Sequence, residues 1–484
     1  MTFTIRPYGR TPPRSNVGLV CNVQHPPVVA DCESDRWLAT TFHTLPIEQV
    51  PPSTRLYIDS ELARSYLRMG IGEAIFQQSA MTRYSIDGRD IYPIPQEVAV
   101  DLESLILWRD WIEGCGGRVK SKTGTAFSLL RASLDAPIHL NRGNVPDIPT
   151  IIGGRVHSCI GFDVLPEIEI WDISAAYART LAAMRVDGKW KEAKLDLDSD
   201  AEQFAWVAVR VPEMEHGPLP ERERNAKHFG LWWDIFAERE FHTGTVVSGV
   251  WSADELRAAV NVGCKIIRRN AAYKLYASSR EPFARWWENV QLGRSLPAKA
   301  AALAKITGNV LWGCFAPATG KRKSVRYANR PGWKREKIVK LLDDLPASRW
   351  RRDLALAELV TSKVRAKVYN EAMTPANGQL VSVCVDGGLF RPGFTPTGEH
   401  WRLKDRGSAC AFLKPYIYAY QRDNGQVVYK VAGVPERHKA AFFQATEAQR
   451  FDHRQVGTGN PTEKKVALHR LSEGFPGSCI DRSA

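Results

Sequence analysis

Residues 168–177 read IEIWDISAAY, and the fold of the chain follows from this stretch. Apolar residues alternate from Ile168 onward, and the alternation leads into a carboxylate at Asp172. The pattern therefore predicts a β-strand that ends in an acidic side chain. An aromatic residue, Tyr177, follows five positions later. A carboxylate at the end of a strand can hold a divalent ion together with a neighbouring backbone oxygen.

A second apolar run, residues 380–385, also leads into a carboxylate, Asp386, which Gly387 and Gly388 follow. Two such strands side by side can hold two divalent ions about 3.5–4 Å apart. Ions in that arrangement activate a hydroxyl nucleophile and neutralise a departing pyrophosphate, which is the chemistry of nucleotidyl transfer. An Asp after an apolar strand is also a common turn or helix cap. For either position alone, that structural role is the more frequent one.

A helical stretch places Lys305, Asn309, Trp312 and Gly313 at i, i+4, i+7 and i+8, so they share one face. On that face Lys305 would offer a point charge to the β- and γ-phosphates of a nucleotide. Asn309 would shape the floor under a base pair, and Gly313 would let the backbone approach closely. The alternative is a buried apolar stripe, formed by Leu303, Ile306, Val310, Leu311 and Trp312.

The chain carries an excess of positive charge. Its 484 residues include 66 Lys and Arg against 53 Asp and Glu, a formal net charge of +13. Many Lys and Arg residues lie between 321 and 337, interleaved with Tyr327 and Trp333. This pattern favours binding to single-stranded nucleic acid over the alternative that the protein is simply a basic enzyme without a polyanionic partner. Arg294 and Lys299, ahead of the Lys305 helix, would add phosphate contacts or belong to a solvated face.

The composition is that of a globular protein with two or three subdomains, and it disfavours membrane insertion. Hydrophobic residues make up 44% and charged residues 25%, and no apolar run approaches the roughly 18 residues of a membrane span. The nine cysteines show no paired short spacing, so neither a zinc site nor a disulfide framework is expected. The N-terminal residues lack the apolar core of a secretory signal, which predicts a cytoplasmic protein, in the host cytoplasm if viral.

The remaining sequence predicts strands and helices in mixed order. Residues 1–110 alternate Pro-rich breaks with short apolar runs, which indicates an α+β domain, and helical spacing around 98–111 closes it. A β-rich piece at 204–209 precedes a short helix that Ser252 could cap. Helical patterns then cover 280–313, with a break at Pro297, and 354–369.

In this order the motifs resemble those of family B DNA polymerases, most closely the protein-primed phage and organellar branch. Motif A of the family, Asp-x2-Ser-Leu-Tyr-Pro, is matched by Asp172 and Tyr177, while its Ser, Leu and Pro are replaced. Motif B, Lys-x3-Asn-Ser-x-Tyr-Gly, is matched in spacing by residues 305–313. Motif C, Asp-Thr-Asp-Ser, keeps its second Asp as Asp386 and has Cys384 in place of the first.

Further motifs resemble DNA contacts of the family. Lys414 and Tyr416 match its Lys-x-Tyr motif at the primer terminus, and the Lys430-to-Gly433 segment matches the basic-glycine segment that follows. Gly153 and Gly154 match the Tyr-x-Gly-Gly motif at the template strand. The resemblance covers about residues 118–475. It implies that Asp172 and Asp386 bind two Mg²⁺ ions, with Mn²⁺ as a possible substitute, and that Tyr177 is a steric gate against a 2′-hydroxyl.

The fold implied by the resemblance is α+β, a right-hand polymerase with an antiparallel-sheet palm, helical fingers and a small thumb, preceded by an α+β N-terminal domain. The boundaries are 1–117 for the N-terminal domain, 118–254 for the pre-palm and first palm part, 255–358 for the fingers and basic insertion, 359–430 for the second palm part and 431–484 for the thumb. Primer–template DNA, deoxynucleoside triphosphates and a terminal protein as candidate primer are the implied partners.

The family's proofreading exonuclease needs an Asp-x-Glu motif on an early strand. Asp31-Cys32-Glu33 and Asp59-Ser60-Glu61 are the two candidates, but residues 1–117 are short for that domain. A reduced exonuclease-like or template-binding domain is expected instead. Because Cys384 replaces a family carboxylate, a catalytically silent polymerase-like protein that binds nucleic acid stays open as an alternative. A primase-like or terminal-transferase activity is a third.

Overall fold

A computed structural model gives the structure of the protein. It describes residues 102–221 with short gaps between 120 and 162, 241–315, and 354–431 except 377. It also describes seven strand segments between residues 3 and 93 and five residues between 439 and 444. The basic segment at 321–337 and most of the predicted thumb lie outside the described residues.

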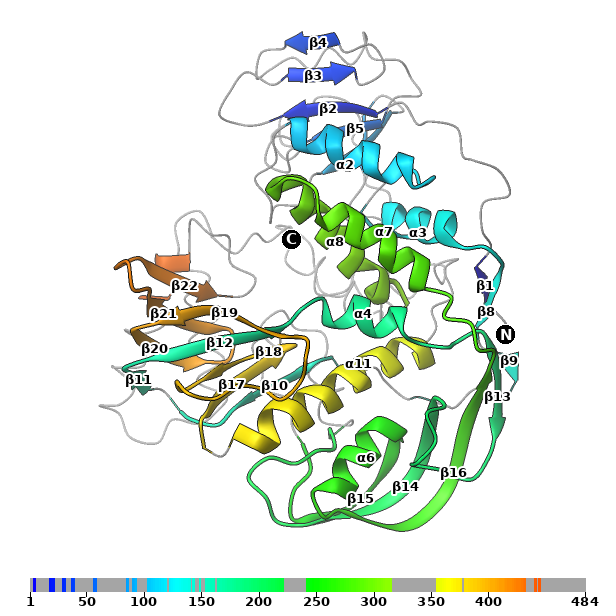
Figure 1. Ribbon diagram of the computed structural model, residues 1–484, viewed down its shortest axis with the longest axis vertical. Coiled ribbons are helices and arrows are strands. Elements are labelled where there is room, and N and C mark those ends of the chain that lie inside the picture. The colour runs from blue at the N-terminus through cyan, green and yellow to red at the C-terminus, as the bar shows by residue number, and fades with distance from the viewer. Residues whose placement is uncertain are drawn as a thin grey trace, which may run out of the picture.

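A five-stranded antiparallel sheet, called the central sheet below, joins parts of the chain that are about two hundred residues apart (Figure 1). Its strands, in spatial order, are β10 (Arg155–Ser158), β17 (Leu380–Val385), β18 (Gly387–Phe390), β12 (Ile168–Ile173) and β19 (Trp401–Gly407). The strands predicted at residues 168–172 and 380–385 are confirmed. They lie in one sheet, with β18 between them.

A four-stranded sheet packs beside the central sheet. It consists of β11 (Asp163–Leu165), β20 (Ala409–Lys414), β21 (Ile417–Gln421) and β22 (Val427–Val431). Buried Leu165 and Phe412 of this sheet share one apolar cluster with Ile168, Val381 and Leu389 of the central sheet. The alternating apolar positions of both sheets thereby face a common core.

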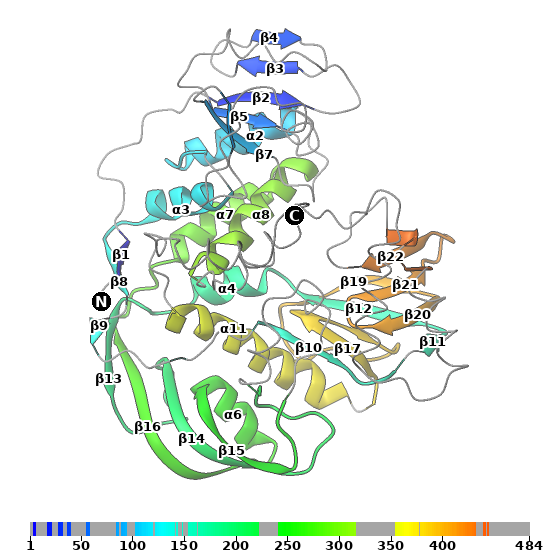
Figure 2. The ribbon, with the colours of Figure 1, turned by 180° about the vertical axis from the view of Figure 1, so that it is seen from behind.

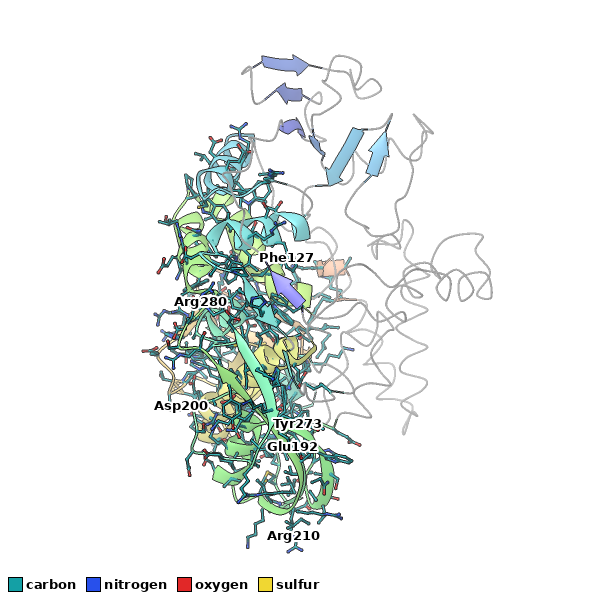
Figure 3. The ribbon with its side chains drawn as sticks, turned by 90° about the vertical axis from the view of Figure 1, so that its right-hand side faces the viewer. Phe127, Glu192, Asp200, Arg210, Tyr273 and Arg280 are labelled. Carbon is teal, nitrogen blue, oxygen red and sulfur yellow. The ribbon has the colours of Figure 1, made fainter. Side chains whose placement is uncertain are left out.

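A third sheet curves around a short helix at the bottom of the view in Figure 1 (Figures 1 and 2). Its strands are β15 (Thr245–Ser252), β14 (Gln203–Val211), β16 (Lys265–Ala277), β13 (Gly188–Glu192) and β9 (Arg142–Gly143). Glu192 and Tyr273 are register partners on β13 and β16, and Figure 3 shows them side by side, with Arg210 farther along the sheet.

The helix against this sheet is α6 (Ala253–Asn261). Ser252 caps it as predicted, because its hydroxyl accepts from the Glu255 amide while the Glu255 side chain accepts from the Ser252 amide.

Helices fill the middle of the molecule, between an N-terminal sheet at the top of Figure 1 and the third sheet at its bottom. They are α2 (Leu102–Gly114), α3 (Lys122–Ser133), α4 (Ala176–Ala182), α7 (Ala284–Arg294), α8 (Ala298–Phe315) and α11 (Leu354–Val368), which continues into a π-helix (Tyr369–Met373) and a 3-10 turn (Thr374–Ala376). The predicted helices at 280–313 and 354–369 are thus confirmed, and so is the one around 98–111 from Leu102 onward, since residues 98–101 lie outside the described residues. The helix α7 ends at Arg294, before Pro297, because Pro restricts the residue preceding it.

One large apolar cluster joins these helices to the central sheet. Ile112, Leu130, Leu181, Leu311 and Val360 are fully buried in it. Trp108 of α2 also donates a hydrogen bond from Nε1 to Thr307 Oγ1 of α8 at 3.1 Å. The helix α8 is therefore fixed both by its apolar side and by a buried polar contact.

The N-terminal part forms a separate six-stranded mixed sheet. Its order is β4 (Arg36–Ala39), β3 (Val28–Asp31), β2 (Val17–Cys21), β5 (Arg55–Ile58), β7 (Arg89–Pro93) and β6 (Tyr84–Ile86). The strand β1 (Phe3–Ile5) pairs instead with β8 (Ile138–Leu140). Asp31 ends β3, but Cys32, Glu33 and residues 59–61 of the two exonuclease candidates lie outside the described residues. Among the helices described, none combines the length and the apolar character that a membrane crossing requires.

Candidate active site

Asp172 and Asp386 lie together at the centre of the central sheet. Asp172 is on β12, directly opposite Gly387 of β18, and the Ile173 amide donates to the Asp386 carbonyl at 2.8 Å. A Cβ atom at Gly387 would stand only 2.7 Å from the Trp171 carbonyl oxygen and 3.1 Å from Asp172 Oδ1. Glycine at 387 thus leaves room for the two carboxylates to share one site.

The electrostatics of this pair suit a divalent cation. Burial, and next the negative charge of Asp172, raise the pKa of Asp386 to about 7. Two carboxylates this close repel one another, and a positive ion between them removes the repulsion. Carboxylate oxygens are also the ligands that Mg²⁺ and Mn²⁺ prefer. The donor set therefore fits the expected metal ions.

Lys404 supplies a positive charge at the same place. Its Nζ lies 3.1 Å from Asp172 Oδ2. In the pairing of β12 with β19, Ile170 faces Asp405 and Trp171 faces Leu403, so Lys404 is the extra residue of a β-bulge. A bulge re-aims the side chain that it carries. The bulge thereby brings Lys404 to Asp172, a contact that the sequence analysis did not predict.

Tyr177 lies in the first turn of α4, buried, with its ring stacked on that of Trp312 of α8 at a centroid distance of 4.4 Å. An added Cβ at Gly154 would meet the Tyr177 hydroxyl oxygen at 2.6 Å and Val385 Cγ1 at 2.6 Å. Only glycine leaves space there. The predicted motifs around residues 154, 177, 312 and 385 are thus packed against one another.

A buried ionic network holds the Gly153–Gly154 backbone in place. Arg365 of α11 donates from Nη1 to the Gly153 carbonyl at 3.0 Å and from Nη2 to Glu255 Oε1 at 2.7 Å and Glu358 Oε1 at 2.5 Å. The two glutamates and the arginine are almost fully buried. The arginine donors are paired with the glutamate oxygens and the Gly153 carbonyl, so the network links α6 and α11 to the backbone of Gly153.

The exposed side of α8 carries the predicted polar stripe. Lys305, Asn309 and Gly313 are exposed at successive turns, whereas Leu303 and Leu311 are buried on the opposite side. The helix therefore has the buried apolar side and, opposite it, an exposed polar side; the nucleotide contact expected of the polar side stays a prediction. Lys305 lies close enough to Asp386 to lower the pKa of that carboxyl, so the stripe borders the carboxylate pair.

Two arginines lie near each other between α4 and α7. The guanidinium carbon of Arg294 is 5.9 Å from the centroid of the Trp287 ring, and that of Arg179 is 5.5 Å from it. Burial, and next the charge of Arg179, lower the pKa of Arg294. An anion would relieve this repulsion between two cations. Arg179, seven residues after Asp172, was not among the predicted site residues, and its only signal is a basic side chain in the helix that follows motif A.

Lys414 and Tyr416 belong to the neighbouring four-stranded sheet. Lys414 ends β20, and Tyr416 lies in the turn to β21 with a left-handed φ of 67°. The Tyr416 ring packs against the small cluster that contains Leu413 and Phe443. These two residues lie on a hairpin separate from the strands that carry Asp172 and Asp386.

No protein-family model matches the sequence, and no curated protein matches it. By structure the chain is similar to Phi29 DNA polymerase in its ternary complex with primer-template DNA and incoming nucleotide. The TM-score is 0.57 at 11% identity, over 89% of this chain and 94% of that one. The binary complex with primer-template DNA gives 0.55 at 11% identity, with the same coverage of both chains. Its complex with single-stranded DNA gives 0.54 at 10% identity, again over 89% and 94%. The chain therefore has a polymerase-like fold, shared over most of its length with Phi29 DNA polymerase.

Proposed function

We propose that this protein is a DNA-directed DNA polymerase that adds deoxynucleotides to a primer 3′-hydroxyl, and that it belongs to the protein-primed branch of family B. The observation that carries the proposal is the pair of carboxylates, Asp172 and Asp386, brought together at the centre of the central sheet. Similarity of fold to a polymerase that binds primer-template DNA supports the same conclusion.

In this proposal Asp172 and Asp386 hold two Mg²⁺ ions, with Mn²⁺ as a substitute. When bound, these ions would lower the pKa of the primer 3′-hydroxyl and neutralise charge on the leaving pyrophosphate. Asp386 must lose its proton to act as a ligand, and the nearby Lys305 favours that ionised form. Lys404 must release Asp172, and it can then turn toward a phosphate oxygen, since its side chain is about half exposed.

Cations around the pair would bind the triphosphate. Lys305 would contact the β- and γ-phosphates, and Arg294 with Arg179 would hold further phosphate oxygens. Asn309, one turn beyond Lys305, would lie under the new base pair. Tyr177, held between Trp312 and Gly154, would press against the sugar and exclude a 2′-hydroxyl.

The DNA contacts and domains follow from the same comparison of motifs. Gly153 and Gly154 would lie at the template strand, and Lys414 and Tyr416 would contact the primer terminus. In this scheme the central sheet is the palm, α7 and α8 belong to the fingers, and the chain after 431 is the thumb. A terminal protein that offers a hydroxyl as primer is a further proposed partner.

Primer extension on a short primed DNA template, with Mg²⁺ or Mn²⁺, tests the proposal. We expect Asp386→Asn to lower the rate more than about a hundredfold, because it removes a direct metal ligand and even outer partners of a metal usually cost 10–100-fold. Glu192→Gln is the matched control, since this exposed carboxylate lies on β13, in a different sheet from the pair. If neither wild type nor control extends primers while both bind DNA tightly, the protein is a silent nucleic-acid-binding relative.

A further inference from the structure

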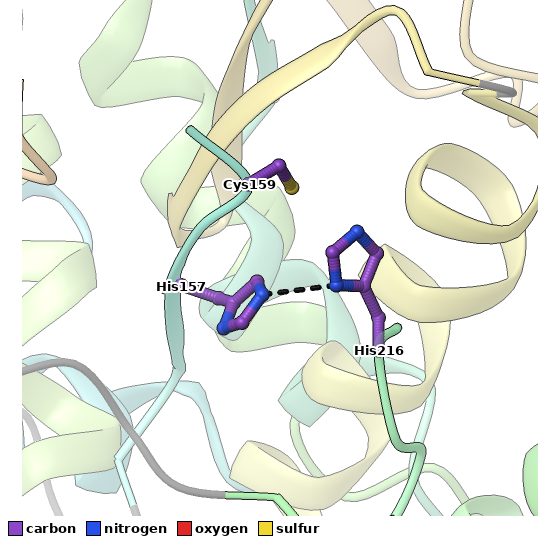
Figure 4. A group of neighbouring side chains, drawn as sticks. All are labelled: His157, Cys159 and His216. Carbon is purple, nitrogen blue, oxygen red and sulfur yellow. Dashed lines mark hydrogen bonds between the residues drawn. The ribbon is translucent and has the colours of Figure 1, made fainter. Parts of the chain in front are cut away.

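A second group of metal-ligand side chains lies outside the carboxylate site. His157 Nε2 and His216 Nδ1 are 3.0 Å apart, and one ring nitrogen of each histidine lies with Cys159 Sγ in a group whose atoms are all within 4.8 Å of one another (Figure 4). His157 is on β10, and Cys159 follows it two positions later, on the same side of the chain. His216 comes from the connection after β14, 57 residues beyond Cys159, so no short sequence spacing marks the group.

The distances approach those of a tetrahedral metal site. Two nitrogen ligands about 2.0–2.1 Å from a tetrahedral zinc ion lie about 3.3 Å apart, and a nitrogen and a sulfur ligand about 3.6 Å apart. The observed separations, 3.0 Å and at most 4.8 Å, lie within about 1.2 Å of these values. Two imidazoles and a thiolate are soft to intermediate ligands, which favour Zn²⁺ over Mg²⁺ or Ca²⁺.

The surroundings orient the ligands. Glu215 Oε1 lies 3.5 Å from His216 Nε2, the ring nitrogen opposite the one that faces His157. A carboxylate in that position fixes the imidazole tautomer and leaves Nδ1 to bind the metal. The His216 carbonyl accepts from Tyr369 Oη at 2.9 Å, which holds the backbone of this connection.

Arg155 acts both for and against a cation here. It donates from Nη2 to the Gly217 carbonyl at 2.7 Å, next to His216, and so anchors the same connection. Its positive charge opposes a nearby metal ion. The Cys159 thiolate and the Glu215 carboxylate offset that charge, since a metal-bound thiol is deprotonated.

We propose that His157, Cys159 and His216 bind one Zn²⁺ ion, with water as fourth ligand, and that this ion fastens the β14–β15 connection to the central sheet. On binding, the Cys159 thiol gives its proton to solvent. The hydrogen bond between the two imidazoles is replaced by two nitrogen–zinc bonds. The ring that donated this hydrogen bond loses the proton from its facing nitrogen to solvent and takes one up on its other nitrogen, so that each neutral ring carries one proton away from the zinc. The ion is distinct from those proposed at Asp172 and Asp386.

Metal analysis of the full-length protein tests this proposal. The protein is loaded with Zn²⁺, dialysed against a weak chelator and measured by mass spectrometry of the metal. We expect one equivalent in the wild type and in Cys115→Ser, a control at another half-buried free cysteine. Cys159→Ser and His216→Ala should lose it, and Glu215→Gln should bind Zn²⁺ about 10–100-fold more weakly.

Two readouts keep the result independent of folding defects and of the proposed polymerase activity. Co²⁺ in the wild type should give a thiolate-to-cobalt charge-transfer band and the strong visible bands of a four-coordinate ion. Asp386→Asn should keep its zinc, because the two sites are separate. A wild type that retains no zinc and shows no such cobalt spectrum, or a Cys159→Ser variant that binds as tightly as Cys115→Ser, overturns the proposal.

Discussion

Replacing Asp386 by Asn should stabilise the metal-free protein above about pH 6 while it abolishes primer extension. Burial and the Asp172 charge raise the pKa of this carboxyl to about 7 from its ordinary 3.8. Below pH 3.8 the carboxyl is protonated in both the folded and the unfolded chain, so it has no effect. Between these pH values the unfolded chain releases a proton that the folded chain retains, and rising pH therefore favours unfolding.

The size of this effect follows from the difference between the two pKa values. A difference of roughly three pH units, at about 1.4 kcal/mol each, gives an upper limit of about 4 kcal/mol. The destabilisation is fully present above pH 7 and disappears as the pH falls toward 3.8. Asn keeps the shape of the side chain and cannot ionise, so Asp386→Asn should lack this dependence.

Urea unfolding followed by tryptophan fluorescence, in a chelator and between pH 4.5 and 8.5, measures the difference. Asp405→Asn on β19, which pairs with β12, is a control of opposite sign. Hydrogen bonds from Arg422 and Tyr420 lower the pKa of Asp405, although burial opposes them. The ionised Asp405 carboxylate therefore stabilises the folded state above the ordinary aspartate pKa, and this contribution is lost as the pH falls through the lowered pKa of the folded state. Asp405→Asn should accordingly be less stable than wild type at neutral pH.

Adding divalent ions tests whether the stability change comes from the removal of the Asp386 negative charge or from another effect of the substitution. An ion bound by both carboxylates stabilises the folded state by mass action, by about 2.7 kcal/mol at one hundred times its dissociation constant. Mn²⁺ should therefore stabilise wild type and have little effect on Asp386→Asn. The reasoning is refuted if the variant is no more stable than wild type at pH 8 in chelator, or if both share one pH profile.

Four further substitutions test neighbouring parts of the site. Tyr177→Ala should raise ribonucleotide incorporation about tenfold or more, because it removes the proposed gate. Gly154→Ala should do the same, because the Cβ added at residue 154 would displace the Tyr177 hydroxyl. Single-nucleotide incorporation assays measure the effect, and Gly161→Ala, with open space around residue 161, is the control. Arg365→Met should lower the free energy of unfolding in urea by about 3–5 kcal/mol, since two buried glutamates lose their counter-charge. Lys404→Ala should lower the Mn²⁺ concentration that gives half-maximal extension, because Asp172 no longer has to leave an ion pair before it binds metal. The decrease should be no more than about fivefold, since an exposed ion pair contributes about 1 kcal/mol or less.

Local pattern was sufficient to predict the elements that carry the site. The alternation before Asp172 and the apolar run before Asp386 each gave a strand, because the period of side chains along a strand is a local property. The spacing of Lys305 and Asn309 likewise gave a helix with one exposed polar face. The order of strands in the central sheet is set by contacts between segments two hundred residues apart, and no local pattern encodes it.

Residues placed by tertiary contacts were not predicted. Lys404 reaches Asp172 because a bulge interrupts the pairing of β12 with β19, and a bulge depends on both strands. Arg365 joins Glu255, 110 residues earlier, and the Gly153 carbonyl. His216 meets His157 only when the β14–β15 connection folds back on β10. In each of these three contacts, one residue lies on a helix, strand or connection outside the sequence motifs, so the motifs could not predict it.

Backbone strain offers independent support for the motif positions. In the described part of the chain, three non-glycine residues have a positive φ: Ala175 at 53°, Val385 at 66° and Tyr416 at 67°. Each costs about 1–3 kcal/mol, and Val385 is the least suited because it is β-branched. Ala175 lies between Asp172 and Tyr177, Val385 precedes Asp386, and Tyr416 ends the Lys-x-Tyr motif. Strained backbone tends to cluster at functional sites, so its presence at these three positions agrees with the proposed roles of the motifs.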